Sequence, residues 1–300
     1  MNLELKSLIQ HILDQFDSVI EPCRLLHGRG GCFPQFNFLN VDLFGDLIVV
    51  MLHESRPEAW QSELSKALLE TQQVKGVVIQ DRSVRPSEQT CFGEVYDQLT
   101  VSGEGVQYLL NPREIKNPGW FLDMREGRAW LAKQAHGCKV LNLFSYTCGF
   151  SLVALKNGAE LVVNMDMNSS VLNRGKKNHA LNQLDSSKAK FFDHNVMKSF
   201  GKIKRFSPYD IVVIDPPSIQ TGSFQLRRDY PKLMSRLAEW VKPGGLALMC
   251  CNDPLIDALE FEAWMKEFIK TDLSFQRLKQ PDDYPEKDRN RALKVYVLEI

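Results

Sequence analysis

The first 115 residues combine apolar positions at helical spacing with short strand-like runs. Near the N-terminus, apolar side chains recur every three or four residues, which predicts an amphipathic helix. The elements that we expect here are a helix over residues 4–20, a glycine-rich turn segment over 25–34, strands over 36–52, a helix over 57–70, a strand over 77–79 and hairpin strands over 92–110. Residues 1–115 therefore predict a small α+β domain, in which we expect a substrate-binding role.

From Val140 onward, short and almost continuous apolar runs are separated by helical segments. The runs cover residues 140–144, 161–166, 189–192, 211–215, 246–251 and 293–298. Strands that are apolar on both faces are typical of a parallel sheet with helices on both sides. The last run is expected to close the sheet as an antiparallel strand. Residues 116–300 thus predict a doubly wound α/β domain.

Composition narrows the class of protein. The chain is 44% hydrophobic and 25% charged, an ordinary globular balance. It has no run of about 18 apolar residues and no signal-peptide pattern, so we expect a soluble cytoplasmic protein without a membrane span. Seven cysteines without a CxxC pair favour a reducing compartment and give no support to a disulfide framework or a metal site.

The two parts differ in charge. Residues 1–115 contain 9 basic and 16 acidic residues, a net charge of −7, whereas residues 116–300 contain 28 and 21, a net charge of +7. A basic C-terminal part favours a polyanionic partner, and an ordinary solvated surface is the alternative.

The first strand of the α/β domain leads into a loop that could hold a ligand. Gly149 would let backbone approach a ligand at the N-terminus of the following helix. The rings of Phe144 and Tyr146 suit a sulfonium, whose positive charge is attracted to a π face. The alternative is a tight strand–helix turn that binds nothing.

Three further strands end in acidic residues. Asp166 is placed to accept hydrogen bonds from ribose hydroxyls, and Asp193 to meet an adenine amino group, although both could instead cap a helix. Asp215 opens the sequence Asp215-Pro216-Pro217-Ser218, whose rigid, acceptor-rich turn could hold a planar base or amine. Because ligands of open α/β sheets bind at the carboxyl ends of strands, we expect these groups to share one crevice. A nicotinamide enzyme is disfavoured, since the glycine cluster at residues 28–31 does not join a strand to a helix.

These motifs together resemble one family. Phe121-Leu122-Asp123-Met124-Arg125, the run from Leu141 to Thr147, Asp166-Met167, Asp215-Pro216-Pro217-Ser218 and the closing Leu293-Lys294 are similar to the bacterial S-adenosylmethionine-dependent methyltransferases of large-subunit ribosomal RNA that make 5-methylcytidine or 7-methylguanosine. The likeness runs from about Leu25 to the end of the chain, and we expect no PUA domain. The resemblance implies a class I Rossmann-like methyltransferase domain and S-adenosyl-L-methionine as the cofactor.

The resemblance also implies the site residues. The expected cofactor-binding residues are Phe121, Asp123, Arg125, Asn142, Phe144, Tyr146, Gly149, Asp166, Met167, Asp193 and Asp215, and the expected catalytic residues are Asp215, Pro217 and Asn252. One departure is Cys148, which stands where the family usually has glycine, so the cofactor loop could adopt a different conformation.

The choice of methylated atom depends on the two cysteines at the end of the fifth strand. Methylation of cytosine C5 needs a thiolate that adds to C6. Cys250 and Cys251 are near the expected position, but alignment on Gly244-Gly245 places Asn252 there, as in the 7-methylguanosine relatives. We therefore favour guanine N7, which needs no covalent step. Ser218 offers no stacking face, which disfavours an exocyclic amine.

Two other functions remain open from the sequence. The same scaffold could methylate a small molecule or a protein, or the chain could bind the cofactor without catalysis and act on an RNA partner. Arg227 and Arg228 follow the Asp-Pro-Pro turn and could contact RNA phosphates, or could form a solvated helix face. Oligomeric state is not predicted.

Overall fold

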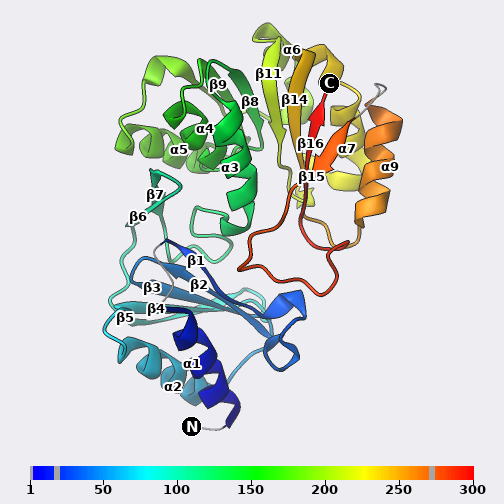
Figure 1. Ribbon diagram of the computed structural model, residues 1–300. Helices are drawn as coiled ribbons and strands as arrows, with labels where there is room; N and C mark the ends of the chain where they lie inside the picture. Colours follow the sequence, from blue (N-terminus) through cyan, green and yellow to red (C-terminus); the bar gives the residue numbers. More distant parts are fainter. Residues whose placement is uncertain (1–2, 17–20, 270–273) are drawn as a thin grey trace. The chain divides into compact units, whose positions relative to one another are not determined.

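The computed structural model describes residues 3–16, 21–269 and 274–300, and its contacts divide the chain into two compact units (Figure 1). Unit 1 comprises Met1–Gly103, Gln107–Leu122 and Pro281–Asp288, and unit 2 comprises Glu104–Val106, Asp123–Gln280 and Arg289–Ile300. Both units are therefore discontinuous along the sequence. The functional domains expected at residues 1–115 and 116–300 stay a prediction.

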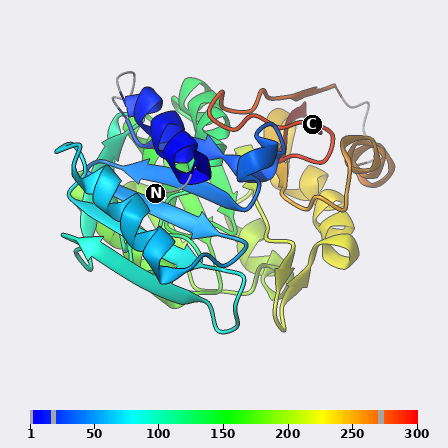
Figure 2. The same ribbon diagram turned by 90° about the horizontal axis from the view of Figure 1, so that it is seen from below.

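Unit 1 is built on a five-stranded sheet in the order β1-β2-β3-β4-β5, in which only the β3–β4 pair is parallel. Its elements are α1 (Leu3–Phe16), β1 (Cys23–His27), β2 (Leu39–Phe44), β3 (Leu47–Leu52), α2 (Glu58–Leu69), β4 (Gly76–Asp81) and β5 (Glu88–Gly93). Figure 2 shows α1 and α2 side by side across one face of this sheet. The apolar stripe of α1, from Leu5 to Ile12, is buried there with Trp60, Leu64 and Leu68 of α2.

The predicted elements of unit 1 are confirmed with one correction. Residues 25–34 were expected to form a turn segment, yet β1 runs through Cys23–His27 before a 3-10 turn at Gly28–Gly30. A cross-strand partner stabilises this strand, because Arg24 lies opposite Asp42 of β2 and its Nε donates to Oδ1 at 2.7 Å. Local glycine content could not reveal that partner. The predicted helix end at residues 17–20 lies outside the described residues.

A late segment of the chain, Pro281–Asp288, belongs to unit 1. Asp283 accepts a hydrogen bond from the backbone N–H of Arg24 at 2.9 Å, and Glu286 contacts His27 Nε2 at 3.0 Å. The N–H of Lys287 donates to the carbonyl of Gly30 at 2.8 Å. These contacts secure β1 from a segment more than 250 residues away in sequence.

A hairpin follows β5. It pairs β6 (Leu99–Gly103) with β7 (Val106–Leu110) through the two-residue turn Glu104-Gly105. Both turn residues have positive φ, 58° and 75°, as a type I′ turn requires. The hairpin strands predicted over 92–110 are thereby confirmed.

Unit 2 contains a seven-stranded sheet in the order β10-β9-β8-β11-β14-β16-β15. The first five strands are parallel, and β16 and β15 are antiparallel, so the predicted closing strand is confirmed. Its strands are β8 (Lys139–Leu143), β9 (Leu161–Met165), β10 (Ala189–Phe192), β11 (Tyr209–Ile214), β14 (Val241–Cys251), β15 (Phe275–Arg277) and β16 (Lys294–Glu299). The strand order reverses between β8 and β11, as in doubly wound folds.

Helices cover both faces of this sheet. They are α3 (Arg125–Gln134), α4 (Gly149–Lys156), α5 (Ser169–Leu181), α6 (Phe200–Arg205), α7 (Leu226–Met234), α8 (Leu237–Trp240) and α9 (Ala258–Phe268). Alternate strand residues such as Leu141 and Leu143 share a core with α6, α7, α8 and α9, while Asn142 and Asn164 point to the side of α4 and α5. The predicted α/β fold is confirmed. Among the helices of the described residues, none has the length and apolar character that a bilayer span needs.

Candidate cofactor and acceptor site

Four parallel strands of unit 2 end in register. Phe192 pairs with Met165, Met165 with Leu143, and Leu143 with Ile214, and each is the last residue of its strand. The residues that follow therefore line one edge of the sheet: Asp193, Asp166, Phe144 and Asp215. The reversal of strand order lies within this row, between β8 and β11, where ligands of open α/β sheets bind.

Asp166 accepts two backbone N–H groups of the strand-end loops and does not cap a helix. Its Oδ2 accepts the N–H of Tyr146 and its Oδ1 accepts the N–H of Asn168, both at 2.9 Å. The cap of α5 is Asn168, whose Oδ1 accepts the N–H of Ser170. Burial raises the pKa of Asp166, while the two N–H bonds act in the opposite direction. Each oxygen keeps a lone pair that fits a ribose hydroxyl.

The loop from β8 to α4 holds three non-glycine residues in the left-handed region. Phe144, Tyr146 and Cys148 have φ of 57°, 47° and 66°. Such conformations cost about 1–3 kcal/mol each and cluster at ligand clamps. The loop is held by the bond to Asp166 and by the N–H of Cys148, which donates to the carbonyl of Ser145 at 2.7 Å. The Phe144 ring packs edge-on against Phe224, with centroids 4.9 Å apart.

Cys148 is accommodated by a glycine on the neighbouring helix. A Cβ at Gly175 in α5 would lie 2.5 Å from the Cys148 Sγ, far inside van der Waals contact. The side chain of Cys148 is completely buried, and burial raises the pKa of its thiol. The loop therefore carries a cysteine at the usual glycine position because α5 leaves room for its sulfur.

We expect Gly175→Ala to destabilise the protein by about 1–3 kcal/mol, the usual cost of overpacking a filled core. Denaturant unfolding would measure this change. Gly201→Ala is the matched control, since a Cβ at that position of α6 meets nothing within 4 Å, and it should be neutral or slightly stabilising. Adding Cys148→Gly to Gly175→Ala should recover part of the loss. Strictly additive losses would contradict the proposed contact.

Asp215 lies in a cluster of charged groups. Burial, and then the nearby Asp123, raise its pKa to about 7, while Arg128 and the Cys250 thiol act in the opposite direction. Arg128 is itself buried and donates to both carboxylate oxygens of Glu104, at 2.6 and 2.7 Å. Asp215 can therefore change its protonation state near neutral pH.

The two cysteines at the end of β14 are poor candidates for a nucleophile. Cys250 and Cys251 are completely buried, and burial raises the pKa of both thiols. Asn252, the next residue, is exposed. The loop that contains it is held by the buried Lys294, whose Nζ donates to the carbonyl of Asp253 at 3.1 Å. An exposed amide thus stands beside two protonated thiols.

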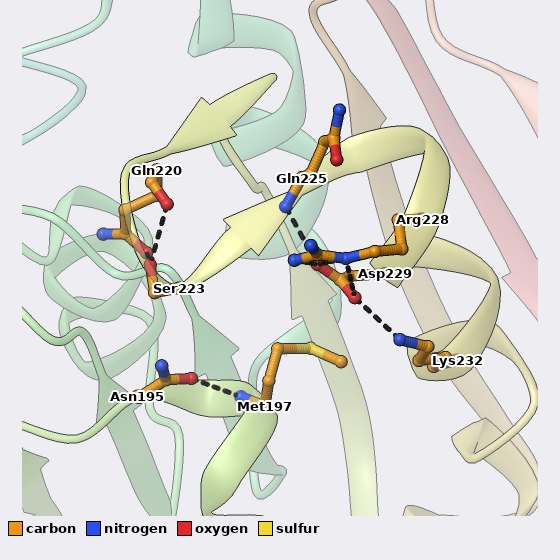
Figure 3. Close-up of polar contacts among 8 residues, drawn as sticks. All are labelled: Asn195, Met197, Gln220, Ser223, Gln225, Arg228, Asp229 and Lys232. Atoms are coloured by element: carbon orange, nitrogen blue, oxygen red, sulfur yellow. Dashed lines mark hydrogen bonds and ion pairs between the residues drawn. The ribbon is translucent and has the colours of Figure 1, made fainter.

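A short hairpin follows the Asp-Pro-Pro turn. It pairs β12 (Ile219–Gln220) with β13 (Phe224–Gln225) and leads into α7. Figure 3 shows Asp229 of α7 between the hairpin and two basic side chains. Its carboxylate accepts the N–H of Gln225 at 2.9 Å, Arg228 Nη2 at 2.6 Å and Lys232 Nζ at 2.9 Å. These donors hold the pKa of Asp229 well below its usual range.

Arg227 and Arg228, two candidates for phosphate contact, have acidic partners. Arg227 pairs with Glu260 of α9, and Arg228 pairs with Asp229. A phosphate would have to compete with these carboxylates. Both side chains are more than half exposed or close to it, 50% for Arg227 and 59% for Arg228, as expected of a solvated helix face. Phosphate contact stays a prediction.

The other predicted site residues lie in several settings. Arg125 and Gly149 are the first residues of α3 and α4, and Asp123 lies in the 3-10 turn before α3. Asn142 is buried in β8, where its Nδ2 donates to Asn164 Oδ1 at 2.9 Å. The remaining ones are exposed, and they are Phe121, Met167, Asp193 and Pro217. Phe121 belongs to unit 1 and all the others to unit 2.

Sequence reasoning missed three residues of this region. Arg128, Glu104 and Asp229 contribute to this region through hydrogen bonds to partners that the fold supplies. A weak signal existed for two of them. Arg128 lies one helical turn after Arg125, and Glu104-Gly105 has the composition of a hairpin turn.

This fold and row of strand ends define a class I Rossmann-like methyltransferase domain. A model of the S-adenosylmethionine-dependent methyltransferase family matches residues 23–299, and the chain belongs to that family. The family resemblance and the cofactor class expected from the sequence are thereby confirmed.

Individual relatives agree with this assignment. The chain is 31% identical over 238 residues to ribosomal RNA large subunit methyltransferase I of Aeromonas hydrophila, covering 75% of this chain and 60% of the relative. It is 30% identical over 263 residues to the protein of the same name from Aliivibrio fischeri, covering 82% and 66%. The chain thus spans about 60% of the length of the first of these relatives. The crystal structure of SMU.776 complexed with SAH has the same fold, with a TM-score of 0.87 at 24% identity over 100% of this chain and 83% of that one.

Proposed function

We propose that this chain transfers a methyl group from S-adenosyl-L-methionine to a base of ribosomal RNA, with guanine N7 favoured over cytosine C5. The observation that carries the proposal is the row of strand ends, in which Asp166 and Asp215 flank the strained Phe144 loop. The large-subunit ribosomal RNA methyltransferases among the relatives support RNA as the substrate. A substrate-binding role for residues 1–115 and a cytoplasmic location are parts of the same proposal.

In this proposal, the residues at the strand ends and in the Phe144 loop contact different parts of the cofactor. When bound, the cofactor supplies an electrophilic methyl group. Asp166 binds the ribose hydroxyls, Asp193 binds the adenine amino group, and the aromatic faces of Phe144 and Tyr146 stabilise positive charge beside them. The further residues that we assign to the cofactor pocket are Phe121, Asp123, Arg125, Asn142, Gly149 and Met167.

On the acceptor side, the chain positions a base. Asp215, Pro217 and Asn252 hold the base so that its acceptor atom is in line with the methyl group, which is the main requirement for a nitrogen that already carries a lone pair. Burial of Cys250 and Cys251 keeps their thiols protonated, which supports N7 over the thiolate route to C5.

We expect the purified protein to transfer the methyl group of labelled S-adenosylmethionine to unmodified large-subunit ribosomal RNA, and 7-methylguanosine to be the product on nucleoside mass spectrometry. RNA that contains 5-fluorocytidine should not trap the protein, because no thiolate adds to the base. Cys250→Ser and Cys251→Ser, each tested singly, should retain measurable transfer.

Other outcomes would point elsewhere. Covalent trapping, or loss of activity in a folded serine variant, would make a cysteine the nucleophile. Binding of S-adenosylhomocysteine without transfer to any RNA would favour a small-molecule or protein substrate, or a non-catalytic role.

A further inference from the structure

One segment of unit 2 has a strongly positive net charge. Residues 171–206 hold nine basic residues against two acidic ones, a net charge of +7 that equals the net charge of residues 116–300. The basic residues are Arg174, Lys176, Lys177, Lys188, Lys190, Lys198, Lys202, Lys204 and Arg205. The segment comprises most of α5, the edge strand β10, and α6.

The edge strand presents a lysine above an aromatic ring on each of its faces. Neighbouring residues of a strand point to opposite faces, so Phe191 and Phe192 face opposite sides of the sheet. Lys176 of α5 lies over the Phe191 ring, with Nζ 5.8 Å from the centroid, and Lys202 of α6 lies over the Phe192 ring at 4.6 Å. Lys190 belongs to the strand itself. All these side chains are exposed or half-buried.

The charges at this edge are not neutralised by carboxylates. Across the described ranges of the chain, Lys176, Lys190 and Lys202 have no acidic side chain within 4 Å, and their polar partners are Asn173, Ser187 and His194. Lys202 Nζ lies 3.3 Å from His194 Nε2, and Lys190 Nζ donates to the carbonyl of Ser187 at 3.2 Å. This contrasts with Arg227 and Arg228, each of which has a carboxylate partner.

We propose that the β10 edge, formed by Lys176, Lys190, Phe191, Phe192, His194 and Lys202, binds the phosphodiester backbone of the RNA substrate. Lysines that have no carboxylate partner release counterions when they contact phosphates, and this release favours binding. The inference rests on the proposed RNA substrate. Lysines also protect edge strands from pairing with other chains, and the test below separates that role from RNA binding.

The test measures RNA affinity without methyl transfer. A fluorescein-labelled RNA hairpin of about 20 nucleotides is titrated with wild type and with the Lys190→Gln/Lys202→Gln variant at several salt concentrations. The logarithm of the binding constant falls linearly with the logarithm of the salt concentration. Loss of two phosphate contacts should make this slope less steep by about 2 and should weaken binding about tenfold at low salt. Lys266→Gln is the matched control, because Lys266 of α9 also lies over a ring, that of Phe275, at the opposite edge of the sheet, with Nζ 5.6 Å from the centroid.

Each outcome decides the proposal. It is supported if the double variant loses slope and affinity, Lys266→Gln does not, and both variants bind S-adenosylhomocysteine like wild type. An unchanged slope overturns it, and if the double variant then self-associates in sedimentation, the lysines serve only to protect the edge. If wild type binds the hairpin through this edge but methylates no RNA, the proposed function fails while the surface stands.

Discussion

Asp215→Asn should lower kcat by about 10²–10³-fold, the loss typical of removing one fixed electrostatic group from an active site. The amide keeps the shape of the side chain and removes the charge that we expect to face the cationic cofactor and acceptor. Affinity for S-adenosylhomocysteine, measured by calorimetry, should change by less than about threefold, because the interaction is made mainly in the transition state. Equal losses in turnover and affinity, or none in either, would make Asp215 structural.

The raised pKa of Asp215 adds a dependence on pH. Turnover of wild type should rise as Asp215 ionises, with a midpoint at or below a pH of about 7, since a bound cation favours the carboxylate. Asp215→Asn should lack this step. A carboxyl group whose pKa is raised by folding stabilises the folded state only while it is protonated. The unfolding free energy of the apo protein, relative to the variant, should therefore fall between pH values of about 4 and 7.

Asp229→Asn should destabilise the protein by about 2–3 kcal/mol and release the β12–β13 hairpin. The buried carboxylate accepts from a backbone N–H and two cationic side chains, and bonds to charged groups of this kind are worth about 1.5–3 kcal/mol. The hairpin carries Phe224, which packs on the Phe144 ring of the cofactor loop. We therefore expect turnover and cofactor affinity to fall with stability. Denaturant unfolding and calorimetry would measure both.

Glu239→Gln is the matched control for Asp229→Asn. Glu239 also pairs with an arginine, Arg236, at 3.2 Å, but both side chains are about 40% exposed. Exposed pairs contribute less than about 1 kcal/mol. A similar loss of unfolding free energy in both variants would show that the burial of Asp229 does not strengthen its ion pairs.

The lowered pKa of Asp229 also predicts a dependence of stability on pH. The stabilisation by this carboxylate is present at neutral pH and is lost only as the pH falls into the acid range.

Hydrophobic periodicity predicted most of the fold, because the spacing of apolar residues within a short stretch of sequence indicates a buried strand or an amphipathic helix. The five parallel strands of unit 2 and the antiparallel β16 follow directly from their apolar runs. The elements that escaped prediction depend on partners elsewhere in the chain. β1 is stabilised by the pairing of Arg24 with Asp42 of β2, and the three-residue β15 by its pairing with β16. Pattern reasoning has no access to such partners.

The candidate site likewise contains residues that local sequence could predict and residues that depend on distant partners. Strand-end residues such as Asp166 and Asp215 could be predicted, because the carboxyl ends of parallel strands meet at one edge. Arg128 and Asp229 could not, since their roles come from the hairpin tip at Glu104 and from the backbone of Gln225. The pairing of Cys148 with Gly175 was equally hidden, because nothing in the local sequence of either residue indicates the other.

The return of Pro281–Asp288 to unit 1 affects the order in which the protein can be completed during synthesis. The contacts of Arg24 and His27 with Asp283 and Glu286 cannot form until residue 286 has left the ribosome. By then the parallel strands of unit 2 have all emerged from the ribosome, whereas β16 has not. Neither unit can therefore finish folding while the other is still to be synthesised. A nascent chain that stalls before residue 280 would expose an incomplete β1 edge in the unit that was translated first.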